Sequence, residues 1–207
     1  MRAGAAAPRA MLAPSFILQW HRCDAPAGVS RKAQRVAARL ASRAALAQAI
    51  ARWRALHGDA PWCDAPVEHD ESGAPRFAHP GAPLLALAHA PGLGGAAIAP
   101  MGAAFVGIDA EPLDAPAARA LAQLAQQTGE SRLAWLDAHW PLRPWCAKEA
   151  AVKAERVPAD LLGRTLRIVE VAAGEAGAQR VRVRTHRGRE LEVETAIDGA
   201  HMTAWTV

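Results

Sequence analysis

The stretch from Arg31 to His57 constrains the fold more than any other part of the sequence, because it contains neither glycine nor proline. Apolar side chains recur in it at near-helical intervals, at Val36, Leu40, Leu46, Ile50 and Trp53. Ser30, just before it, is a favourable N-cap residue. We therefore predict one long amphipathic helix here. Another of its faces is basic, with residues spaced four apart at Arg31, Arg35, Arg39 and Arg43.

The rest of the first half is predicted to form short strands. Ser15–Trp20 is an apolar run, and Leu84–Ala90 and Gly95–Ala99 flank a Pro-Gly-Leu-Gly stretch that is typical of a hairpin. Between the long helix and this hairpin, Gly58–Pro83 is rich in proline and shows little periodicity. We expect an irregular connection there, lying on the surface or over a site.

The second half opens with another apolar run, Phe105–Glu111, which predicts a strand. Helices are expected at Ala115–Gln127, Ser131–His139 and Pro144–Val157. Strands are expected in the tail, at Arg164–Val171, Gln179–His186, Glu190–Ala196 and His201–Val207. Each half offers helix and antiparallel strands, so we predict an α+β fold with two halves, residues 1–103 and 104–207.

Composition limits the partners that the chain can bind. With 207 residues, 51% of them hydrophobic, it can bury a core, and a net charge of +4 favours an anionic partner. Phosphorylated cofactors, acidic proteins and nucleic acids all meet that condition. Lysine is rare, since only Lys32, Lys148 and Lys153 are present beside many arginines. The two lysines that lie five positions apart are therefore candidates for chemistry.

The cysteines and the N-terminal segment predict a cytoplasmic protein. Cys23, Cys63 and Cys146 are widely spaced and fit neither a disulfide framework nor a structural zinc site. Pro14 interrupts the apolar stretch near the N-terminus, and no small-residue cleavage site follows it, so we do not expect an export signal. No apolar run has the length of a membrane-spanning helix, and we expect no membrane association.

The predicted strand at Phe105–Glu111 ends with two acids. Asp109 and Glu111 are two residues apart, so in a strand both side chains leave the same face, about 6 to 7 Å apart. Adjacent carboxylates repel each other unless a cation joins them, and oxygen ligands of this kind suit Mg²⁺. These residues alone leave two interpretations open, a Mg²⁺ site or a strand end with both acids in water.

The last predicted helix carries a second group of charges. Glu149 and Lys153 are i and i+4, hence neighbours on one face. They form either an ordinary surface ion pair or a third carboxylate and a cation beside the two acids of the strand. His89 ends the Leu84–Ala90 run, where a lone histidine is either solvated or part of a site.

In this order and spacing, these fragments resemble the motifs of the 4'-phosphopantetheinyl transferase superfamily. The first motif reads Gly107-Ile108-Asp109-Ala110-Glu111. The second reads Trp145-Cys146-Ala147-Lys148-Glu149-Ala150-Ala151-Val152-Lys153. The chain length is similar to that of the larger, surfactin-synthetase-activating class. That class implies two pseudo-symmetric α/β halves in one chain, and a monomer.

The resemblance implies a Mg²⁺-dependent enzyme that transfers the 4'-phosphopantetheine arm of coenzyme A to a serine of an acidic apo acyl, peptidyl or polyketide carrier protein. Adenosine 3',5'-bisphosphate is released. Asp109, Glu111 and Glu149 are the expected Mg²⁺ ligands. Glu149 and Lys153 are the expected catalytic residues, Glu149 to accept the serine proton and Lys153 to stabilise phosphate charge. The implied cofactor contacts are His89, Lys148, Lys153, Arg31, Lys32, Arg35, Arg39 and Arg43.

Two departures from the family keep other functions open. A Gly-Lys-Pro segment of the family reads Gly73-Ala74-Pro75 here, and its Ser-His-Ser reads Ala88-His89-Ala90. A carrier-protein or nucleotide-binding module with weakened catalysis is therefore one alternative. A Mg²⁺-dependent nuclease is another, but such sites often have a lysine where this chain has Leu113. We expect a transferase, and no binding of nucleic acid.

The tail offers a basic surface for an acidic carrier protein. Arg180, Arg182 and Arg184 alternate along a predicted strand and so share one face. The alternative is a solvated edge strand that charge keeps soluble.

Overall fold

The computed structural model describes residues 16–23, 29–114, 116, 120, 129–130, 133, 142–156, 166–174 and 177–206. The helices are α1 (Arg31–His57), η1, a 3-10 turn (Pro61–Asp64), and α3 (Leu142–Glu155). The strands of the first half are β1 (Ile17–Arg22), β2 (Val67–His69), β3 (Pro75–Phe77), β4 (Leu85–Ala90) and β5 (Leu93–Ile98). Those of the second half are β6 (Ile108–Pro112), β7 (Arg167–Ala173), β8 (Gln179–Arg184), β9 (Glu190–Asp198) and β10 (His201–Thr206).

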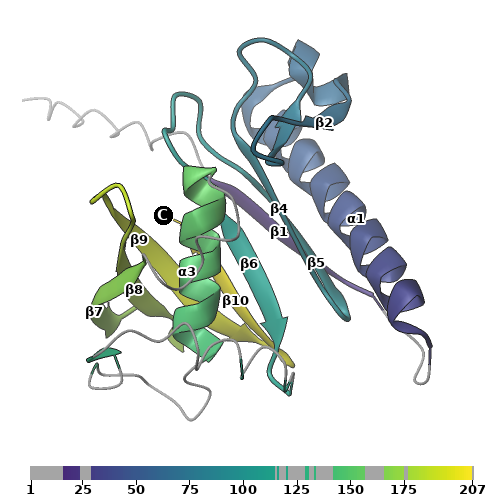
Figure 1. Cartoon of the computed structure of the whole chain (residues 1–207). Helices are drawn as coiled ribbons and strands as arrows, with labels where there is room; N and C mark the ends of the chain where they lie inside the picture. The colour runs from purple at the N-terminus through teal and green to yellow at the C-terminus, as the bar shows by residue number, and fades with distance from the viewer. Residues whose placement is uncertain are drawn as a thin grey trace, which may run out of the picture.

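The strands form two main sheets in which neighbours are antiparallel. One has the order β1-β5-β4, and the other has the order β6-β10-β9-β8-β7. β2 and β3 form a separate small hairpin. α1 packs on the three-stranded sheet and α3 on the five-stranded sheet (Figure 1). The predicted α+β class is confirmed. In the described parts of the chain, no helix combines the length and apolar character needed to cross a membrane.

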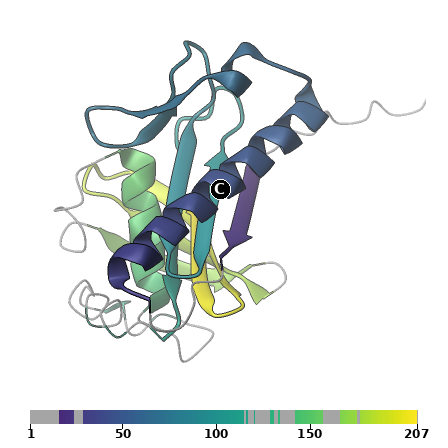
Figure 2. The same cartoon turned by 90° about the vertical axis from the view of Figure 1, so that its right-hand side faces the viewer.

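Helix α1 begins and ends at the predicted residues. The Ser30 side chain accepts a hydrogen bond from the Ala33 N–H at 3.3 Å, which satisfies one amide of the first turn. Its buried side chains are mostly alanines, at Ala38, Ala41, Ala45 and Ala49. Small side chains on that stripe let the helix lie close to the sheet, and Figure 2 shows it crossing β4 and β5 along much of its length.

Two glycines mark the points of closest contact between helix and sheet. A Cβ on Gly94 of β5 would lie 2.1 Å from the Ser42 nitrogen of α1, and one on Gly107 would lie 2.0 Å from the Ala150 oxygen of α3. No side chain fits at either position. Since Gly107 directly precedes β6, this contact holds the start of β6 against α3.

The two sheets lie side by side. Besides a core under each helix, a group of buried residues joins β4 and β5 to the start of β6, and it includes Ala88, Ala97, Val106 and Ile108. β4 and β6 are in contact (Figure 1). As a result, the end of β4 that carries His89 lies near the strand that carries Asp109.

Several predicted bounds differ from the structure. The 58–83 connection is not wholly irregular, because it holds η1 and the β2–β3 hairpin. The turn between β4 and β5 is only Pro91-Gly92, so Leu93 belongs to β5. β6 begins three residues later than predicted, at Ile108. α3 covers 142–155 rather than 144–157. The predicted helices at 115–127 and 131–139 lie outside the described residues except at single positions.

Candidate functional site

The ion pair between Asp109 and Lys153 links β6 to α3. The Asp109 side chain is buried, and its Oδ1 accepts a hydrogen bond from the Lys153 Nζ at 2.7 Å. Its second oxygen, Oδ2, is also buried and has no hydrogen-bond partner of normal geometry among the described residues, although the buried Cys146 thiol lies close to this carboxyl group. A buried carboxylate oxygen without a partner costs free energy, so this atom is suited to bind a cation or a donor from outside the chain.

Glu111 and Glu149 share the environment of Asp109. Burial raises the pKa of Glu111 to about 7, and repulsion by Asp109 acts in the same direction. Burial likewise raises the pKa of Glu149 to about 7, with repulsion from Asp109 and, more weakly, from Glu111. Lys153 opposes both shifts. The three acids predicted from the two motifs therefore interact with one another in the fold.

Lys153 is the cation of this group. Burial acts to lower the pKa of its amine, but the attraction of Asp109 and Glu149 outweighs burial and raises the pKa. The amine thus stays charged at neutral pH. Its side chain is 35% exposed, so it can also meet a ligand.

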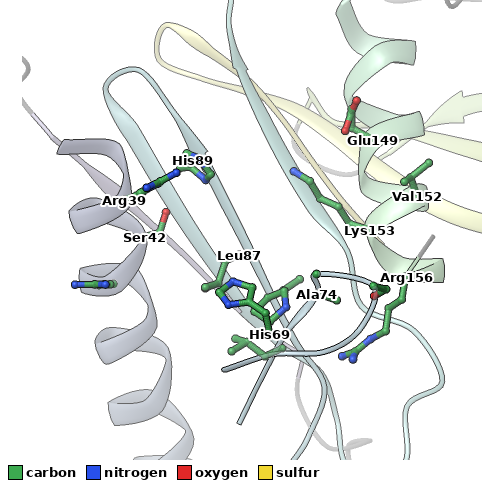
Figure 3. A pocket seen from close by; sticks show the side chains of 16 residues that line it. Arg39, Ser42, His69, Ala74, Leu87, His89, Glu149, Val152, Lys153 and Arg156 are labelled. Atoms are coloured by element: carbon green, nitrogen blue, oxygen red, sulfur yellow. The ribbon is translucent and has the colours of Figure 1, made fainter. Parts of the chain in front are cut away.

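Glu149 and Lys153 line a cavity of about 620 Å³ between α1, β4, α3 and the β2–β3 hairpin. Figure 3 shows Arg39 and His89 on one side of this space and Glu149 and Lys153 on the other. The charged residues of its wall are four cations and one acid: Arg39, Arg43, Lys153, Arg156 and Glu149. This balance favours an anionic ligand.

His89 lies beside Arg39 on one side of the cavity, with Lys153 on the other side. Partial burial lowers the pKa of its imidazole, and the charges of Lys153 and Arg39 lower it further, against a smaller opposite effect of Asp109. The ring is therefore neutral at neutral pH when no ligand is present. An anion between the two walls would remove part of the cause of this shift.

The basic residues of α1 divide into two groups. Arg39 and Arg43 line the cavity. Arg35 is near enough for its charge to lower the pKa of His89. Arg31 and Lys32 are exposed in the first turn and do not belong to the described cavity wall. The structure thus brings the third and fourth turns of α1 to the cavity wall, with Arg35 of the second turn nearby, rather than its first turn.

Lys148 has quite different surroundings from Lys153. It is 1% exposed, and its Nζ donates a hydrogen bond to the Glu130 Oε2 at 2.8 Å. The Glu130 Oε1 accepts a hydrogen bond from the Ile168 N–H at 2.8 Å. Burial lowers the pKa of Lys148, and Glu130 opposes this effect. Lys148 lies inside the fold rather than in the described cavity wall.

The arginines of β8 do not form a free basic surface. Each faces a glutamate of a neighbouring strand, in the pairs Arg180–Glu194 at 3.3 Å, Arg182–Glu170 at 2.8 Å and Arg184–Glu190 at 2.7 Å. The predicted alternation is present, but the charges form a cross-strand ladder. The prediction of an edge strand is wrong, because β8 lies between β7 and β9, and the arginines of this inner strand are exposed or half-buried in ion pairs with both neighbours.

The donor set suits Mg²⁺, although no three His, Cys, Asp or Glu side chains within the described ranges are close enough to enclose a metal ion. Lys153 occupies the place beside Asp109. Asp109 nevertheless has a buried oxygen without a partner, and two more carboxyl groups have pKa values raised by burial and repulsion. A hard dication that prefers oxygen ligands would relieve both conditions.

Four polar residues of the described cavity wall were not assigned to the site from the sequence: Ser42, His69, Ser72 and Arg156. Arg156 follows Lys153 by three positions, so the helical spacing that grouped Glu149 with Lys153 could have found it. His69 and Ser42 carry no comparable signal, because only the packing of the hairpin and of α1 brings them to the cavity.

In comparisons with known proteins, the chain matches no protein-family model and no curated protein at a significant level. The function of the site is therefore inferred from its own residues.

Proposed function

We propose that this chain is a Mg²⁺-dependent 4'-phosphopantetheinyl transferase of the larger, surfactin-synthetase-activating class. It transfers the phosphopantetheine arm of coenzyme A to a serine of an acidic apo carrier protein, as a monomer in the cytoplasm. One observation carries the proposal. Asp109, Glu111, Glu149 and Lys153 interact with one another, and the last two line a cavity whose other side carries Arg39 and His89.

The architecture supports the proposed pair of pseudo-symmetric halves. In the first half, one long helix packs on an antiparallel sheet of three strands, and in the second, one helix packs on an antiparallel sheet of five. The cavity draws on both halves, with Arg39 and His89 from the first and Glu149 and Lys153 from the second. A site between two halves suits a long, charged substrate such as coenzyme A.

The three acids would hold Mg²⁺, which when bound supplies charge neutralisation for the pyrophosphate of coenzyme A. The protein's own cations act on the same phosphates from both walls. Lys153 contributes a fixed charge from α3, while Arg39, Arg43 and His89 contribute donors from α1 and β4. Together they align the pyrophosphate.

The chemical step exchanges one P–O bond for another. The serine oxygen of the carrier protein bonds to the phosphorus that bears the pantetheine arm, and the bond from that phosphorus to the bridging oxygen breaks. Adenosine 3',5'-bisphosphate leaves with the electron pair of the broken bond. Glu149 accepts the serine proton as the general base.

Two of the three alanines that suggested a module with weakened catalysis do not support that alternative. Ala88 and Ala90 are 1% and 3% exposed, whereas His89 between them is exposed. Alternation along β4 turns the two alanines away from His89 and the cavity. They therefore remove no polar group from the wall that would bind the cofactor. Ala74 does line the cavity, and at that position the wall lacks a cation.

Purified protein with Mg²⁺ and coenzyme A is expected to add one phosphopantetheine mass to an apo carrier protein. The test is mass spectrometry on a panel of fatty-acid, polyketide and peptide-synthetase carriers, with a serine-to-alanine carrier as the matched control. A panel that stays unmodified throughout would remove the transferase proposal. Bound coenzyme A without transfer would instead favour the weakened module.

Binding of coenzyme A is expected to take up protons through His89. Burial and the charges of Lys153 and Arg39 lower the pKa of this imidazole, so phosphates that neutralise those charges are expected to raise it again. At a pH of about 6, the ring gains protons when the ligand binds. Calorimetry in two buffers of different ionisation enthalpy measures this uptake. An uptake that persists unchanged in His89→Asn would assign it to another group.

A further inference from the structure

Arg156 adopts an unusual backbone conformation at the end of α3. Its φ is 54°, and it is the one non-glycine residue of the described chain with a positive φ. Glycine takes this conformation freely, whereas a side chain there costs free energy. Such strain persists where the side chain has a use, so the outlier raises the question of what Arg156 contacts.

Its first contact is Asp70, in the turn between β2 and β3. Arg156 donates to the Asp70 Oδ2, while the Oδ1 accepts hydrogen bonds from the Ser72 N–H, the Ser72 hydroxyl and the Ala74 N–H. These bonds lower the pKa of Asp70 to about 2, so its charge is permanent at neutral pH. Asp70 is thus a rigid acceptor that fixes one edge of the guanidinium.

The guanidinium keeps further donors, because it has five N–H bonds and Asp70 accepts one of them. Arg156 lines the cavity beside the hairpin turn, as Figure 3 shows for Arg156 and Ala74. The hairpin residues at this part of the wall carry no charge: Ser72, Gly73, Ala74 and Pro75. The positive charge at this end of the cavity therefore comes from α3.

We propose that Arg156 is a phosphate contact of the cavity, and that Asp70 is the residue that positions it. Lys153 lies three residues earlier on α3 and binds Asp109, so the two cations extend along one wall of the cavity. The hairpin turn and the end of α3 together form one anion subsite. The identity of the natural ligand, coenzyme A, rests on the function proposed above, whereas the anion subsite does not.

Arg156→Gly distinguishes the contribution of the side chain from that of the backbone. Glycine adopts the observed φ without strain, so the variant loses the guanidinium but keeps the backbone conformation. We expect an unchanged or higher unfolding temperature together with a 10- to 100-fold higher Kd for coenzyme A and for pyrophosphate, measured by calorimetry. Arg182→Ala is the matched control, since it likewise removes an arginine from an ion pair with an acid, here Arg182 of β8 with Glu170 of β7. Arg156→Lys, which keeps the charge, is expected to recover part of the affinity.

The positioning role of Asp70 is tested by a double-mutant cycle. Asp70→Asn keeps an oxygen for Ser72 and Ala74 but loses the charge that orients Arg156, so we expect weaker binding of both probes. In the Arg156→Gly background, Asp70→Asn should change the Kd by less than about 2-fold. Equal, additive effects in both backgrounds would overturn the positioning role.

The subsite and the proposed function can fail separately. If Arg156→Gly binds both probes as tightly as Arg182→Ala does, the subsite is overturned whatever the transfer assay shows. If no carrier is modified but Arg156→Gly still weakens pyrophosphate binding, the subsite stands and the transferase proposal falls. In an active enzyme, Arg156→Gly should raise the KM for coenzyme A with little change in kcat, since the contact holds substrate and transition state alike.

Discussion

Asp109→Asn is expected to slow phosphopantetheine transfer at least ~1000-fold, a barrier increase of about 4 kcal/mol, while the protein stays folded. Asp109 is the centre of the charged group, since it binds Lys153 and its charge acts on Glu111, Glu149 and His89. Asparagine matches it in shape but removes the negative charge that would hold Mg²⁺. Single-turnover transfer, followed by mass spectrometry, measures the loss.

The fold should tolerate this change, because it also removes repulsion. Asp109 raises the pKa of both Glu111 and Glu149, so the neutral variant should lower both values, which carboxyl NMR can follow. Glu149→Gln should slow transfer by a similar factor, because it removes both the proposed base and the third proposed Mg²⁺ ligand. Glu192→Gln, at an exposed position of β9, is the control. A wild-type rate in either site variant would mean that the acids do not form the catalytic site.

The sequence predicted the elements whose signals are local. Ser30 and the apolar repeat were enough for the bounds of α1, but not for its buried face, because Val36 and Leu40 are exposed and alanines are buried instead. The alternation in 179–206 was enough for β8, β9 and β10. β2 and β3 were missed because each has three residues and no alternation to read. Their pairing depends on the bonds of the Asp70 turn, which a propensity argument does not weigh.

For the candidate site, short spacings were predictable and long contacts were not. Glu149 and Lys153 are one helical turn apart, and Asp109 and Glu111 share a strand face, so each pair follows from periodicity. The bond between Arg156 and Asp70 joins residues that are 86 positions apart, and no local pattern predicts it. It depends on how the two halves of the chain pack.

The spacing of the two motif lysines already indicated that their side chains point in different directions. Lys148 and Lys153 are five residues apart, which is about 140° around a helix, so they cannot face the same cavity equally. Lys153 shares its face with Glu149 and lines the cavity, whereas Lys148 points to the buried Glu130. Similarly, the arginines of β8 were predicted to share a face, but the register that sets glutamates opposite them depends on the β8–β9 turn.

Lys148→Met is therefore expected to act on stability rather than on cofactor binding. The Lys148–Glu130 pair is almost completely buried, with side-chain exposures of 2% and 1%. Removing one partner of such a pair leaves a buried charge and costs about 3 to 5 kcal/mol of the free energy of unfolding. Urea denaturation measures this loss. The rate of transfer per folded molecule should stay within about 3-fold of wild type, because the side chain lies outside the described cavity wall.

A second substitution tests the cause of that loss. Glu130→Gln added to Lys148→Met removes the other charge but keeps an oxygen for the Ile168 N–H, so it should restore most of the lost stability. Lys32→Met, at the exposed start of α1, controls for the loss of one positive charge from the chain. If Lys148→Met unfolds like wild type but binds coenzyme A poorly, Lys148 contacts the ligand, and the buried pair opens when the cofactor binds.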